Sequence, residues 1–92
     1  SFLFVVETAA TDMDILTDGT DKFVGGIYTG VNNATGKTFI SGASNDVVTL
    51  NGTTKGGLAG SIIRVTAIAS AKYAIEGITL GSGTLVTPFA DA

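Results

Sequence analysis

The clearest structural signal in the chain lies between residues 62 and 78, where two runs of alternating side chains flank a short link. The runs are Ile62-Ile63-Arg64-Val65-Thr66-Ala67-Ile68-Ala69 and Lys72-Tyr73-Ala74-Ile75-Glu76-Gly77-Ile78. Because successive side chains of a strand point to opposite faces, Tyr73 and Ile75 should share the buried face of the second run. The link Ser70-Ala71 lacks the Asn-Gly chemistry of a tight turn, so we expect an antiparallel hairpin with a loop slightly longer than two residues.

The composition extends this β-strand prediction to the whole chain of 92 residues. Thr, Val and Ile together make up about a third of the sequence, and thirteen Gly are scattered through it. β-Branched side chains fit pleated sheets, and Gly is typical of turns. We therefore predict one all-β domain over residues 1–92, a small antiparallel β-sandwich or β-barrel. Residues 1–7 and 84–92 are expected to form extended terminal arms.

Further short strands are expected at residues 2–7, 11–17, 22–29, 37–41 and 46–50. Gly25-Gly26 should break or bulge its strand, at a point where another backbone approaches closely. Pro88 cannot donate a ladder hydrogen bond, so residues 84–89 should be an edge strand or an extended arm.

The remaining segments carry turn residues. We expect turns at 18–21 and 42–45 and a polar loop over 30–36. Asn51-Gly52 has the sequence of a tight hairpin turn, and the Gly-rich segment 53–60 should be a flexible connection.

The chain carries few charges. Only 14% of its residues are charged, against about 25% in ordinary soluble domains. A small domain must display most of its side chains, so we expect neighbouring polypeptides to cover part of this surface. The net charge of −3 disfavours a nucleic-acid partner. We also expect no membrane span or signal peptide, because the longest apolar run, Phe2 to Val6, is too short and has no basic flank.

Few residues are suited to catalysis or metal binding. The chain has no His and no Cys, which excludes a Ser-His-Asp triad, Cys catalysis and thiolate zinc sites. The acidic residues Asp12, Asp14, Asp18 and Asp21 could supply oxygen ligands to calcium, but they do not have the spacing of an EF-hand loop. Two interpretations stay open: a solvated acidic turn, which we favour, and a calcium site.

Two further motifs have a structural and a chemical interpretation. Gly81-Ser82-Gly83 and Gly56-Gly57 with Gly60 could cradle phosphate, but without the Lys-Ser/Thr of a P-loop they are better explained as turns. Glu7 and Glu76 could form a glycosidase pair, but we expect Glu76 to form an ion pair with Arg64 or Lys72. We predict no enzyme, no cofactor and no metal.

The segment from Asn45 to Phe89 resembles small all-β virion proteins of tailed bacteriophages, above all capsid decoration (cement) proteins. The resemblance rests on the Asn51-Gly52 turn, the strand around Tyr73, the Gly81-Ser82-Gly83-Thr84 run and the Thr87-Pro88-Phe89 end. The aromatic position in the strand is often Trp in such proteins and is Tyr73 here.

This resemblance implies a structural protein on the outer surface of the virion, where it binds the major capsid protein and stabilises the shell by bridging capsomers. It also implies a homo-oligomer, with a trimer favoured. The expected partner interface comprises the apolar residues of both terminal arms: Phe2, Leu3, Phe4, Val5, Val6, Leu85, Val86, Pro88 and Phe89. The alternative is a tail-fibre or surface-adhesion module that binds a host receptor or glycan.

Overall fold

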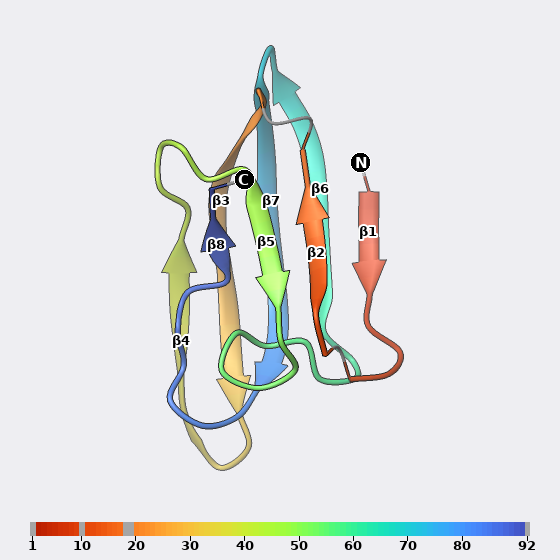
Figure 1. Ribbon diagram of the computed structural model, residues 1–92, viewed down its shortest axis with the longest axis vertical. Coiled ribbons are helices and arrows are strands. Elements are labelled where there is room, and N and C mark those ends of the chain that lie inside the picture. The colour runs from red at the N-terminus through yellow and green to blue at the C-terminus, as the bar shows by residue number, and fades with distance from the viewer. Residues whose placement is uncertain (1, 10, 18–19, 92) are drawn as a thin grey trace.

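The computed structural model describes residues 2–9, 11–17 and 20–91 (Figure 1). Within these residues there is no helix, and the chain forms eight strands. They are β1 (Phe2–Val5), β2 (Met13–Leu16), β3 (Lys22–Val31), β4 (Ala34–Ile40), β5 (Val47–Leu50), β6 (Ile62–Ala69), β7 (Lys72–Gly81) and β8 (Phe89–Ala90). Accordingly, no described segment is a helix of the length and hydrophobicity needed to cross a membrane.

The strands form two sheets that pack face to face. The larger sheet has the order β1-β6-β7-β3-β4, and the smaller has the order β2-β5-β8. In Figure 1 the smaller sheet overlaps the middle of the larger one, while β1 and β4 lie at its two sides. The all-β prediction is confirmed, and the architecture is a small β-sandwich.

The core lies between the two sheets and draws on both. Its fully buried members are Val6, Ile15, Phe23, Ile27, Val48, Leu50, Ile63, Val65, Ile75 and Phe89. Alternation therefore predicted the inward face of β7 correctly for Ile75, and Ile63 and Val65 of β6 are buried beside it. Tyr73 is partly buried and packs against the same cluster.

The hairpin of β6 and β7 is confirmed, but its loop is shorter than expected. Only Ser70 and Ala71 separate the strands, and Ala71 adopts a positive φ of 62°. The register shifts between Ala67 and Ala69, so the additional residue forms a bulge inside β6 instead of lengthening the loop.

One strand pair of the larger sheet is parallel, which the sequence analysis did not anticipate. β3 and β7 run side by side in the same direction, from Lys22 opposite Lys72 to Val31 opposite Gly81. The sheet is consequently mixed, and β4, β5 and β6 all belong to the connection between the two parallel strands.

The polar loop predicted at residues 30–36 is wrong. β3 continues to Val31, β4 begins at Ala34, and the turn consists of Asn32 and Asn33, with Asn33 at a φ of 56°. Asn tolerates this left-handed conformation. The strand predicted at residues 37–41 is confirmed as the second half of β4. Residues 34–36 were missed because β4 is an edge strand with mostly exposed side chains, so that burial does not impose an apolar pattern on it.

Gly25 does not break β3, although the expected close approach of another backbone is present. Gly25 has a φ of 136°, and a Cβ atom at this position would collide with the carbonyl oxygen of Ile75 on β7. The strand therefore passes through Gly25 because that residue has no side chain.

The predicted Asn51-Gly52 hairpin is also wrong, because β5 and β6 belong to different sheets. Instead, the Asn51 side chain organises the connection. Its Oδ1 accepts hydrogen bonds from the backbone N–H groups of Thr53 and Lys55, each at 2.9 Å. Its Nδ2 donates to Thr54 Oγ1 at 3.0 Å. The Gly-rich connection is thus held by hydrogen bonds, and its Gly56 and Gly57 are buried.

Candidate partner-binding surfaces

The outer side of the larger sheet is a broad apolar surface, which we call the sheet face. The register of the strands aligns its side chains in two rows that cross all five strands. One row is Val5, Ile62, Ile78, Tyr28 and Thr38, and the next is Leu3, Arg64, Glu76, Gly26 and Ile40.

The apolar members of these rows are well exposed. Ile40 is 78% exposed, Ile78 60% and Val5 59%, and Val24 and Leu80 lie exposed on the same side. Scattered exposed apolar residues are ordinary, whereas a contiguous apolar surface marks a site of interaction. The exposed apolar residues of the sheet face are neighbours in the strand register, which makes this face a candidate site of interaction.

The two rows contain a single pair of charges at their centre. Arg64 Nη1 lies 4.0 Å from Glu76 Oε1, and both side chains are more than half exposed. The predicted pairing of Glu76 with Arg64 is therefore confirmed. An exposed pair at this distance stabilises the fold by less than about 1 kcal/mol.

The middle of the sheet face is hollowed, and Gly26 is one of the residues that line the hollow. The hollow has a volume of about 680 Å³, and the side chains of Leu3, Tyr28, Ile62 and Ile78 contribute to its walls. Tyr28 leans across β4, since a Cβ atom at Gly36 would collide with the Tyr28 hydroxyl. The hollow beside the ring is open to solvent.

A second apolar surface lies at the open side of the sandwich, and we call it the edge hollow. Phe2 and Phe4 of β1 reach it from one sheet, and Ile15 and Leu16 of β2 reach it from the other. Phe23, Val65 and Tyr73 complete its apolar lining, and its volume is about 300 Å³. Phe2 and Leu16 are 62% and 61% exposed, so the opening of this hollow is apolar.

The predicted N-terminal interface residues divide between these surfaces. Phe2 and Phe4 line the edge hollow, while Leu3 and Val5 belong to the sheet face. Val6 is buried in the core of its own chain and is not available to a partner. β1 is the edge strand of the larger sheet and pairs with β6, so residues 2–5 are part of the sandwich.

The predicted C-terminal interface residues require a larger correction. Leu85, Pro88 and Phe89 are buried within the chain, and only Val86, at 44%, is well exposed. The Thr49 N–H donates to the Pro88 carbonyl at 2.8 Å, and β8 then pairs with β5 as an edge strand. This segment does not extend toward a partner as an arm. Its buried apolar side chains pack inside the sandwich and close it.

The acidic stretch does not form a metal site in the part of the chain that the structure describes. Asp12 and Asp14 are exposed, and the Asp21 carbonyl accepts a hydrogen bond from Thr17 Oγ1 at 2.7 Å. Asp18 and the start of its predicted turn lie outside the described residues. Among residues 2–9, 11–17 and 20–91, no three acidic side chains gather where a metal could bind.

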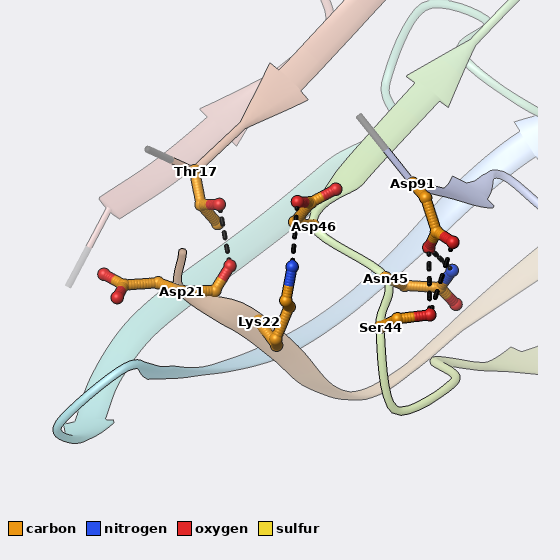
Figure 2. Close-up of polar contacts among 7 residues, drawn as sticks. All are labelled: Thr17, Asp21, Lys22, Ser44, Asn45, Asp46 and Asp91. Carbon is orange, nitrogen blue, oxygen red and sulfur yellow. Dashed lines mark hydrogen bonds and ion pairs between the residues drawn. The ribbon is translucent and has the colours of Figure 1, made fainter. Parts of the chain in front are cut away.

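Sequence analysis missed Asp46, the most buried carboxylate that the structure describes. Figure 2 shows it accepting a hydrogen bond from Lys22 Nζ at 3.1 Å. In the same loop, Ser44 and Asn45 donate to the Asp91 carboxylate. The Lys22–Asp46 contact joins β3 of the larger sheet to the loop that enters β5 of the smaller one, and so stabilises the sandwich. The contacts with Asp91 hold the same loop to the end of β8. The only advance indication was that Asp46 directly precedes an apolar strand.

The Gly-rich segments serve packing and turns. Gly56, Gly60 and Gly83 have positive φ values. The backbone N–H groups of Gly56 and Ser82 already donate to the Thr53 carbonyl, at 3.1 and 3.0 Å. Of the two interpretations of these segments, the structure therefore supports turns.

Comparisons with protein-family models, with curated proteins and with solved structures found no match to this chain. The class that the structure defines is a small mixed-sheet β-sandwich with two exposed apolar surfaces.

Proposed function

We propose that the chain is a structural subunit of a phage particle, which binds the outer surface of the capsid and stabilises the shell by bridging capsomers. The shell-binding surface in this proposal is the edge hollow together with β1. The partner is the major capsid protein, and the subunit performs no catalysis.

The observation that carries the proposal is the exposure of large apolar side chains. Among the described residues, side chains such as Phe2, Leu16 and Ile78 are 60% exposed or more, in a chain that has few charges to keep such surfaces soluble. Apolar area removed from water contributes about 25 cal/mol per Å². A partner that covers these residues therefore gains affinity without any new polar contact.

The geometry of the edge hollow suits a protein segment as the occupant. Its aromatic lining is open to solvent, and β1 has an unpaired edge in the sheet order. A strand of a neighbouring polypeptide could pair with that edge and place a side chain in the hollow. Weak contacts of this kind, repeated around a closed shell, add up to a large stabilisation.

The experiment is a binding assay with expanded heads of the phage whose genome encodes the chain. We expect saturable binding at a simple ratio to the major capsid protein. The double variant Phe2→Ser with Leu16→Ser should bind at least about 10-fold more weakly, since it removes apolar area only at the edge hollow. Both residues are exposed, so its fold should be unchanged by circular dichroism.

The matched control is Val24→Ser, which removes an exposed apolar side chain from the sheet face instead. It should bind like the unmodified chain. If the unmodified chain ignores heads, the proposed function is refuted. If the double variant and the control bind equally, a different surface makes the contact.

A module that binds a host receptor or glycan is the second candidate. It is favoured by the half-exposed ring of Tyr28 in a hollow that also contains Thr38, Arg64 and Glu76. Such a module predicts few copies per particle and binding to cells, whereas the capsid subunit predicts copies comparable in number to the major capsid protein.

A further inference from the structure

We propose that the sheet face binds the sheet face of a second copy of this chain. The two copies are related by a two-fold axis that lies between the sheets, parallel to the strands and above the gap between β6 and β7. This pairing uses a different surface from the edge hollow, so it goes beyond binding to a shell.

The size of the sheet face is near the minimum for a specific pair. β4 of each copy lies outside the overlap, so four strands of each copy meet across this axis. With a spacing of about 4.8 Å and a rise of about 3.3 Å per residue, these four strands give a face of roughly 500 Å² per chain. Two such faces together bury roughly 1,000 Å², about the smallest area expected of a specific protein interface. Sheets packed face to face in this way, with their strands approximately aligned, are an ordinary arrangement.

The charges on the face are self-complementary about this axis. Because the axis exchanges the positions of β6 and β7, it places Arg64 of one copy opposite Glu76 of the other, and the reverse. Two ion pairs then form across the interface, and no like charges face each other at its centre. Lys72, at the end of β7, would lie over the end of β6 and not over a second Lys72.

The same axis also matches the shapes of the two faces. In the row that contains Arg64 and Glu76, Leu3 is the neighbour on one side and Gly26 on the other. The axis therefore places Leu3 of each copy over Gly26 of the other, a residue that has no side chain. In the adjoining row it sets Ile62 against Ile78. Charge and shape thus select the same axis independently.

This symmetry differs from the trimer that the sequence resemblance implied. A two-fold axis makes an interface from one surface patch that meets itself, which is what a central pair of opposite charges allows. The net charge of −3 would oppose association elsewhere, but the two rows that meet here are neutral as a whole.

The test is the molar mass of the purified full chain, measured by sedimentation equilibrium over a range of concentrations. We expect twice the 9.2 kDa mass of one chain. Arg64→Glu alone and Glu76→Arg alone should each weaken the pair about 100-fold or more, because each places like charges opposite one another. Both side chains are exposed, so circular dichroism should report an intact fold.

Mixing the two single variants in equal amounts should restore the paired mass. One variant then presents two Glu at the centre of its face and the other presents two Arg, so every cross-pair is attractive. Thr84→Glu, an exposed position outside both rows, is the charge control and should pair normally.

Four results would each overturn the proposal. They are a monomer at all concentrations, a trimer, single variants that pair like the unmodified chain, and a mixture that stays monomeric. A monomer that still binds heads would refute the pairing alone. A pair that ignores heads would refute the capsid function alone.

Discussion

The hydroxyl groups of Thr29 and Thr79 lie 2.9 Å apart in the interior of the sandwich, on the neighbouring parallel strands β3 and β7. Both residues are fully buried. A buried hydroxyl without a partner is costly, so each Thr satisfies the other. This polar pair ties together two strands that are fifty residues apart in the sequence.

The losses of stability caused by the two single replacements in this pair should add up to more than the loss caused by the double replacement. We expect Thr29→Val and Thr79→Val each to lower the free energy of unfolding by about 1–3 kcal/mol, because the remaining hydroxyl is left buried and unpaired. The double variant should lose clearly less than the sum. Denaturant unfolding of all four proteins measures the difference, and additivity within about 0.5 kcal/mol would contradict this explanation.

Gly25 should be intolerant of any side chain. We expect Gly25→Ala to destabilise the fold by about 3 kcal/mol or more, because its φ is unfavourable for Ala and the new methyl group meets the Ile75 carbonyl. Gly30→Ala is the control on the same strand, where a Cβ atom makes only ordinary contact, 3.4 Å from Tyr28. It should change the free energy of unfolding by less than about 1 kcal/mol. Equal losses would show that the backbone of β3 adjusts freely.

The Asn51 side chain should be the main local stabiliser of the connection between the sheets. We expect Asn51→Ala to cost about 1–3 kcal/mol, because two backbone N–H groups lose their acceptor. Asn51→Asp keeps an acceptor oxygen and should cost less. Hydrogen exchange of the Thr53 and Lys55 amides, followed by NMR, should be faster in the Ala variant; unchanged protection would show that the loop is held by other contacts.

The Lys22–Asp46 pair should contribute measurably to stability, because Asp46 is buried while Lys22 is about one-third exposed. We expect Asp46→Ala to lower the free energy of unfolding by about 1–3 kcal/mol. Asp14→Ala, an exposed carboxylate on β2, is the control and should stay within about 0.5 kcal/mol. Similar values for the two variants would mean that burial of Asp46 has no energetic consequence.

The sequence predicted core residues best where one face of a strand is buried and the other is exposed to solvent. That condition holds for β7, so alternation identified Ile75 as a core residue. It fails for β4, because most side chains of that strand are exposed and need not alternate between apolar and polar. The Asn32-Asn33 turn before β4 was missed for the same reason. The parallel pairing of β3 with β7 could not be predicted, because local patterns carry no information about which distant strands meet.

The candidate surfaces were predicted in part. The apolar character of Phe2 to Val5 correctly indicated exposure, but only the structure shows that alternate residues serve different surfaces. Pro88 suggested either an edge strand or an arm, and the structure shows a short edge strand, β8, directly after a Pro88 that is buried. The sheet face was missed because its residues are spread over five strands and become neighbours only through the register.

The most direct test of the proposed function is the molar ratio of this chain to the major capsid protein in purified particles of the phage that we propose to encode it. We expect a simple ratio near one or a small fraction of one, because a subunit that bridges capsomers must recur over the whole shell. Absence from the particle, or presence in only a few copies, would contradict a role in stabilising the capsid.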